Sequence, residues 1–112
     1  MKSIFFDEIE NTQDYAINEF KDEPLLIVSK AQTAGRGTNK NKWENADQSL
    51  AVSLAFNKEI VNFKKTLVPL LAGYSFVSLH QIEDLKLKWP NDITLNEDKV
   101  GGVLVEENND LI

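Results

Sequence analysis

Cysteine is absent from this chain of 112 residues. Its absence excludes a disulfide framework and a thiolate metal site, and it makes a reducing cytoplasm the expected compartment. No apolar run approaches the ~18 residues of a membrane-spanning helix, and the short run after Met1 is too short for a signal peptide. With 42% hydrophobic residues, the chain fits one small, soluble, cytoplasmic domain with a modest core.

Positive charge is also scarce, because 12 Lys and Arg face 18 Asp and Glu and the formal net charge is -6. Neutralising nucleic-acid phosphates requires a clustered basic face, so we expect no DNA partner. The partners are expected to be small molecules or proteins. The single arginine, Arg36, lies between two glycines, which is a placement that needs an explanation.

Hydrophobic periodicity predicts an α+β fold. A helix is expected after Asn11, which is a suitable N-cap, and a longer one over about residues 66–82, with Pro69 in its first turn. We expect a mixed, largely antiparallel sheet with both helices packed on one face. Leu111 and Ile112 resemble the beginning of another strand, so residues 1–112 are expected to be the N-terminal portion of a longer domain. Strands are predicted over residues 3–9, 25–31, 49–56, 85–89, 93–95 and 100–106.

Polar residues gather at three places, residues 11–13, 32–43 and 88–102. The middle stretch, QTAGRGTNKNKW, combines glycine backbone with the guanidinium of Arg36 and the ring of Trp43. Glycine lets backbone N–H groups approach an anion, arginine binds phosphate or carboxylate in a fork, and tryptophan covers a ring. These features favour a nucleotide or anionic ligand, although neither the Walker motif nor the dinucleotide fingerprint is present.

Each of these features alone has an ordinary structural explanation. A Gly-Arg-Gly segment is typical of a surface loop, and a lone tryptophan is typical of a core. Lys88 and Lys99 suit solvated strand positions, and the polar residues beside them suit a turn. Only the combination of the three places indicates a site.

That combination resembles the catalytic domain of biotin protein ligases. The resemblance covers essentially the whole chain, and its most specific part is Lys88-Trp89-Pro90-Asn91-Asp92 followed by Lys99-Val100-Gly101-Gly102. It implies a two-step reaction in which biotin and ATP give biotinyl-AMP, and biotin then passes to a lysine of a biotin carboxyl carrier protein domain of a carboxylase. Two like charges about 4 Å apart repel by about 4 kcal/mol at an effective dielectric near 20, so a lysine is needed between the biotin carboxylate and the α-phosphate.

The resemblance also assigns residues. It implies catalytic roles for Lys99 and Arg36, and Asp92 is the candidate ligand of Mg²⁺. The implied biotin site consists of Asn11, Thr12, Gln13, Gln32, Arg36, Gly37, Thr38, Lys99, Gly101 and Gly102. The implied ATP site consists of Trp43, Lys88, Asn91 and Asp92.

The sequence departs from the family pattern in two places. Members often continue the loop as Gly-Arg-Gly-Arg-Arg-Gly-Arg, whereas Gly37 is followed here by Thr38-Asn39-Lys40, and lysine does not make the bidentate contacts of arginine. Asn11-Thr12-Gln13 replaces the more usual Ser-Thr-Asn. No winged-helix DNA-binding domain is expected.

Two alternatives stay open. The chain is a non-catalytic biotin- or nucleotide-binding fragment of such a ligase, whose open sheet edge favours a homodimer through the sheet, or it is a lipoyl or octanoyl ligase relative that shares the fold.

Overall fold

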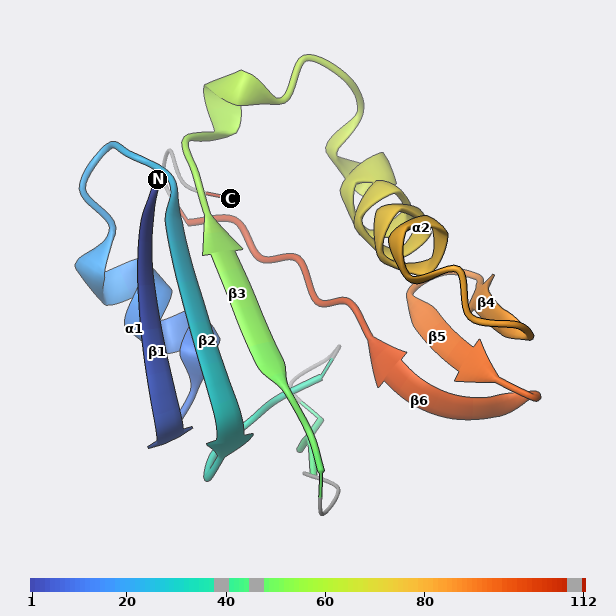
Figure 1. Cartoon of the computed structure of the whole chain (residues 1–112). Coiled ribbons are helices and arrows are strands. Elements are labelled where there is room, and N and C mark those ends of the chain that lie inside the picture. Colours follow the sequence, from blue (N-terminus) through green and yellow to red (C-terminus); the bar gives the residue numbers. More distant parts are fainter. Residues whose placement is uncertain (38–40, 45–47, 109–111) are drawn as a thin grey trace. The chain divides into compact units, whose positions relative to one another are not determined.

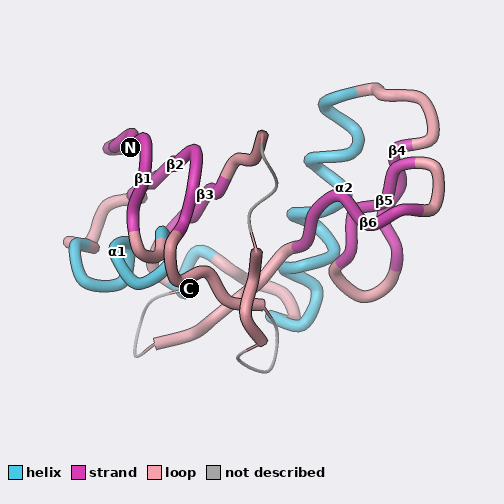
Figure 2. Tube along the Cα trace, turned by 90° about the horizontal axis from the view of Figure 1, so that it is seen from below, coloured by secondary structure: helices cyan, strands magenta, loops and turns pink. Residues whose placement is uncertain are grey.

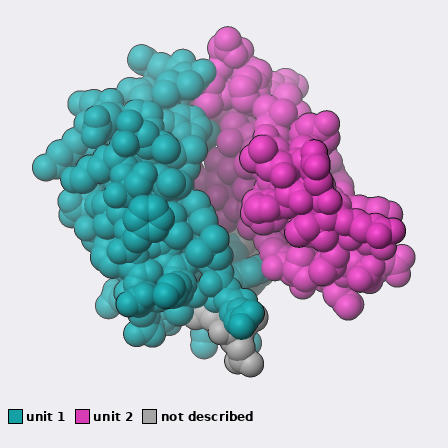
Figure 3. All heavy atoms as spheres, viewed as in Figure 1, with its two compact units in different colours: residues 1–60, 107–112 teal, residues 61–106 magenta. Residues whose placement is uncertain are grey.

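The computed structural model of the protein describes residues 1–37, 41–44, 48–108 and 112. The chain divides into two compact units, residues 1–60 with 107–112 and residues 61–106, which are coloured separately in Figure 3. The first unit contains β1 (Lys2–Ile9), α1 (Thr12–Glu19), β2 (Leu25–Gln32), β3 (Ala51–Ala55) and the short 3₁₀ helix η2 (Lys58–Ile60). The second contains the 3₁₀ helix η3 (Lys65–Leu67), α2 (Val68–His80), β4 (Leu85–Lys88), β5 (Asp92–Leu95) and β6 (Asp98–Gly102), as Figure 1 shows.

The first unit is a three-stranded mixed sheet in the order β1-β2-β3. β1 pairs with β2 in parallel, and β2 pairs with β3 antiparallel, so that Ile27 lies between Ile4 and Ser53. A parallel pair requires a crossover connection, and α1 provides it. Figure 2 shows α1 along one face of this sheet.

The core of the first unit lies between α1 and the sheet. Leu25 and Ile27 alternate with outward-facing residues along β2, and they meet Ala16 of α1 and Ala55 of β3. The rings of Phe6 and Tyr15 close one side of this core in an edge-to-face contact, with centroids 5.0 Å apart. The helix is therefore fixed on the sheet by burial of small and aliphatic side chains.

The second unit is an antiparallel meander in the order β4-β5-β6. Asn96 and Glu97 have φ values of 52° and 74°, the left-handed geometry of a two-residue hairpin turn whose twist matches the flanking strands. The β5–β6 register shifts between Ile93 and Thr94, which places Thr94 opposite Lys99. This irregularity increases the local twist of the hairpin.

One face of the meander packs against α2. Leu85 and Ile93 are buried, and Gly73 of α2 approaches Leu87 so closely that a Cβ on the glycine would lie 2.6 Å from Leu87 Cδ1. The other face of the strands carries polar side chains, because residues alternate between faces along a strand. Lys86 and Lys88 therefore share a face with the register partners Thr94 and Asp92.

The α+β class and the positions of both helices are confirmed, but two details of the prediction are wrong. One sheet was predicted, whereas the described residues form two separate three-stranded sheets. A strand was predicted over residues 100–106, whereas β6 runs from Asp98 to Gly102 because the tight turn starts pairing at Asp98. Ile112 exchanges two backbone hydrogen bonds of 2.9 Å with Phe56, directly after β3.

Candidate functional site

Asn11 is fixed at the start of α1 by three hydrogen bonds. Its Oδ1 accepts the backbone N–H groups of Gln13 and Asp14 at 2.9 and 3.0 Å, which caps the helix. Its Nδ2 donates to the Ala34 carbonyl oxygen at 2.9 Å. The buried Asn11 side chain thus ties the helix start to the chain just after β2, and its amide is engaged in structure.

Thr12 lies at the centre of a buried polar network. Its backbone N–H donates to Gln32 Oε1 at 2.8 Å, and its hydroxyl lies 3.1 Å from the same oxygen and 2.8 Å from Ser53 Oγ. Ser53 donates in turn to Gln13 Oε1 at 2.7 Å. The structure thus brings together Thr12, Gln13 and Gln32, which were predicted separately from the helix start and from the end of β2.

Ser53 was not among the predicted site residues and lay only within the strand predicted over residues 49–56. The residue is 5% exposed, and buried hydroxyls are normally hydrogen-bonded. A serine on the core-facing side of an otherwise apolar strand is the signal that would have found it.

A side chain at Gly35 would displace the end of the Gln32 side chain. A Cβ at this position would lie 2.7 Å from Gln32 Nε2 and 3.3 Å from the Cβ of Trp43. The Trp43 backbone N–H donates to the Gly35 carbonyl oxygen at 3.0 Å, and Arg36 forms an isolated antiparallel bridge with Lys42. The described part of this loop is thus a narrow hairpin placed beside Gln32.

Arg36 forms a salt bridge with Asp14 of α1, with 2.8 Å between Nη2 and Oδ1. Its side chain is 23% exposed, so the guanidinium is held near the helix start rather than in open solvent. A ligand carboxylate or phosphate at Arg36 would compete with Asp14. Gly37 follows Arg36 and donates its N–H to the Asn41 carbonyl oxygen, and the predicted site residue Thr38 lies outside the described residues.

Lys99 and Asp92 meet on the polar face of the second unit. Lys99 Nζ lies 3.0 Å from Asp92 Oδ1, with the side chains 49% and 28% exposed. Lys88 is the direct register partner of Asp92 on β4 and shares this face. The predicted catalytic lysine and two of the predicted nucleotide-side residues are therefore gathered on one sheet.

The remaining predicted residues of this unit have mainly structural contacts. Asn91 Nδ2 donates to the Val103 carbonyl oxygen at 3.1 Å, and the Val103 N–H donates back to the Asn91 carbonyl at 2.9 Å, so Asn91 clamps the turn to the end of β6. A Cβ on Gly101 would meet Ile93 at 3.7 Å, an ordinary contact, and neither Gly101 nor Gly102 has a positive φ. The backbone of β6 therefore does not itself demand these two glycines.

A metal site is not preassembled in the part of the chain that the structure describes. Within it, no three His, Asp or Glu side chains gather closely enough to hold a metal ion. Asp92 supplies a carboxylate oxygen, which suits Mg²⁺ that is held mainly by nucleotide phosphates and water.

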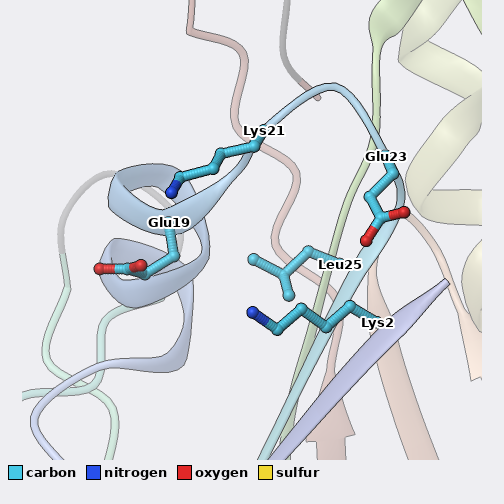
Figure 4. A pocket seen from close by; sticks show the side chains of 5 residues that line it. All are labelled: Lys2, Glu19, Lys21, Glu23 and Leu25. Carbon is cyan, nitrogen blue, oxygen red and sulfur yellow. The ribbon is translucent and has the colours of Figure 1, made fainter.

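A surface hollow of about 100 Å³ opens at the other end of the first unit. Figure 4 shows its lining, with Lys2 and Leu25 from the strands, Glu19 from the end of α1, and Lys21 and Glu23 from the connection. The charged residues are exposed, and the hollow is smaller than the ~300–1,000 Å³ typical of small-molecule sites. It contains none of the predicted site residues.

Among the described residues, no helix is long and apolar enough to cross a membrane.

Comparisons with known proteins connect this chain to ligases. The model of the biotin/lipoate A/B protein ligase family matches residues 5–110. Biotin–protein ligase 2 of Arabidopsis thaliana is 33% identical over 110 residues, an alignment that covers 86% of this chain and 32% of that protein.

Two solved structures are similar over almost the whole chain. Biotin acetyl coenzyme A carboxylase synthetase from Helicobacter pylori, with bound biotinylated ATP, has a TM-score of 0.85 and 34% identity over 98% of this chain and 56% of that one. Biotin protein ligase from Aquifex aeolicus, in complex with biotin and ATP, has a TM-score of 0.81 and 31% identity over 98% and 48%. The chain spans about half the length of these proteins and about a third of the Arabidopsis relative. It belongs to the biotin/lipoate A/B protein ligase family.

Proposed function

We propose that this chain activates biotin with ATP to form biotinyl-AMP and then transfers biotin to a lysine of a biotin carboxyl carrier protein domain. Family membership supports the reaction class, and the two similar solved structures contain biotin with ATP or a biotinylated nucleotide. The name of the Helicobacter pylori relative supports a carboxylase as the acceptor. The cytoplasm is the proposed compartment, because a chain without cysteine does not depend on disulfides that form in an oxidising compartment.

The observation that carries this proposal is the position of Lys99. Its ammonium stands on a strand of a hairpin, 3.0 Å from the carboxylate of Asp92, and is not carried by a long loop. In the first step a biotin carboxylate oxygen forms a bond to the α-phosphorus of ATP, and the bond from that phosphorus to the bridging oxygen breaks as pyrophosphate leaves with the electron pair. An ammonium fixed between the two anions offsets their repulsion and stabilises the charge that develops.

Asp92 has two proposed contributions. It holds Lys99 in place before ATP arrives, and it is the residue that would bind Mg²⁺ together with the phosphates. When bound, the ion would shield the negative charge of the leaving pyrophosphate. Lys88, on the same sheet face, is proposed to contact the phosphates as a further cation.

The polar network around Thr12 is the proposed site of the biotin ring. Thr12 and Gln32 are joined by a hydrogen bond, and Gly35 leaves the end of Gln32 room that any larger residue would take. Hydroxyl and amide groups of this kind satisfy the polar ureido ring, which is costly to bury without hydrogen bonds. Arg36 is proposed to contact the carboxylate or the adenylate once it is released from Asp14.

The proposal is tested by looking for both products. The purified chain is incubated with biotin and Mg-ATP, biotinyl-AMP is sought by mass spectrometry, and a biotin carboxyl carrier domain is then added and probed with streptavidin. Adenylate followed by labelled carrier supports both steps. Biotin binding without adenylate would instead support a non-catalytic fragment, and labelling by lipoate or octanoate in preference to biotin would support a lipoyl or octanoyl ligase.

A further inference from the structure

Ser53 of β3 connects two residues of the proposed biotin site, because its hydroxyl contacts side chains of α1 instead of its own strand. Its Oγ lies 2.8 Å from Thr12 Oγ1 and 2.7 Å from Gln13 Oε1. Ser29, a fully buried serine on β2, behaves differently, because its hydroxyl donates to the Ala31 carbonyl of its own strand at 2.7 Å. Ser53 therefore links β3 to α1, whereas the Ser29 hydroxyl is hydrogen-bonded within β2.

The proton count gives this network a direction. A hydroxyl has one hydrogen, and Gln13 Oε1 only accepts, so the proton of Ser53 goes to Gln13. Ser53 Oγ is then the acceptor in its 2.8 Å contact with Thr12 Oγ1, and the one Thr12 hydroxyl proton is shared between Ser53 Oγ and Gln32 Oε1, which lies 3.1 Å away. Gln32 Oε1 still receives the Thr12 backbone N–H. Donation thus runs from Thr12 to Ser53 to Gln13, and the orientation of the Thr12 hydroxyl depends on both partners.

The length of Gln13 is what makes this link possible. An asparagine at this position is shorter by one carbon–carbon bond, about 1.5 Å, and would leave its carbonyl oxygen beyond hydrogen-bond distance of Ser53 from the same backbone position. Gln13 is only partly buried, so the bond to Ser53 orders the end of its side chain.

We propose that Gln13 and Ser53 act as a coupled pair of positioning residues, which fix the Thr12 hydroxyl for the ring of the acid substrate. This inference rests on the proposed function, because it concerns the biotin site. The pair raises the affinity for biotin and leaves the affinity for ATP unchanged.

Calorimetric titration with biotin, and separately with Mg-ATP, tests the pair in four variants: Ser53→Ala, Gln13→Asn, the double variant, and Ser29→Ala as the matched control. Each single change at the pair is expected to weaken biotin binding about 3- to 10-fold. The double variant is expected to bind no more weakly than the weaker single variant, because both changes break the same link. Ser29→Ala removes an equally buried hydroxyl and is expected to lower only the midpoint of urea unfolding.

Three results would refute the coupling of Gln13 and Ser53 while leaving biotin binding established. They are multiplicative losses of biotin affinity in the double variant, an unchanged affinity in Ser53→Ala, and an equal loss in Ser29→Ala. A wild-type chain that binds no biotin would overturn the proposed function, and the inference with it. A parallel loss of Mg-ATP affinity would show a general disturbance of the fold and would also overturn the pair.

Discussion

Replacing Lys99 with alanine is expected to remove adenylate formation while the chain stays folded. The biotin carboxylate and the α-phosphate must approach to about 4 Å, where two unit charges repel by about 4 kcal/mol at an effective dielectric near 20. Without a fixed cation this repulsion adds to the activation barrier, and each 1.36 kcal/mol is a factor of ten in rate. The expected loss is therefore about a thousandfold in the first step.

The same change is expected to affect stability little. Lys99 and Asp92 are 3.0 Å apart, but their side chains are 49% and 28% exposed, so solvent screens the pair. Ion pairs at such positions contribute at most about 1 kcal/mol. The backbone pairing of β6 with β5 does not involve the Lys99 side chain, and the midpoint of urea unfolding should shift only slightly.

The assay is pyrophosphate release with biotin and Mg-ATP, with Lys86→Ala as the matched control. Lys86 shares the sheet face of Lys99, since both are register partners of Thr94, but it has no assigned role. Its removal is expected to change the rate less than threefold. Retention of more than a tenth of the rate in Lys99→Ala, or an equal loss in Lys86→Ala, would refute the claim that a cation fixed at Lys99 offsets the repulsion between the two anions.

Three further substitutions follow from close contacts. Gly35→Ala places a Cβ 2.7 Å from Gln32 Nε2, so the Gln32 side chain must move. The affinity for biotin, measured by calorimetry, should then fall about tenfold. An unchanged affinity would show that Gln32 does not contact biotin. Gly73→Ala places a Cβ 2.6 Å from Leu87 Cδ1. The overpacking should cost about 1–3 kcal/mol, which exceeds the gain of about 1 kcal/mol in helix propensity, so urea unfolding should show net destabilisation. A stabilised variant would contradict this packing. Asn11→Ala removes the helix cap and the hydrogen bond to the Ala34 carbonyl, and should lower the free energy of unfolding by about 1–2 kcal/mol. A loss of biotin affinity without this destabilisation would instead indicate that Asn11 contacts the ligand directly.

The parts of the fold set by local chemistry could be predicted from the sequence. Asn11 caps α1 because its short side chain reaches the free N–H groups of the next residues, and Pro69 stands in the first turn of α2, where its missing N–H costs little. Neither feature depends on distant residues. The bounds of β6 were not predicted correctly, because the strand was expected over residues 100–106 and runs from Asp98 to Gly102.

The parts set by contacts far apart in the sequence could not be predicted. The salt bridge between Arg36 and Asp14 and the network through Ser53 join residues from different elements, and periodicity carries no information about such pairs. Glycine in this loop was predicted as flexible backbone for an anion, whereas the structure adds that a Cβ on Gly35 would displace the end of Gln32. The separation of the strands into two sheets likewise depends on pairing over the whole chain.

The most direct test of the central claim is pyrophosphate release by the purified chain with Mg-ATP, comparing biotin with lipoate and octanoate. The account predicts release that depends on biotin and is at background level with the other two acids. Release that prefers lipoate or octanoate, or no release with any acid, would contradict it.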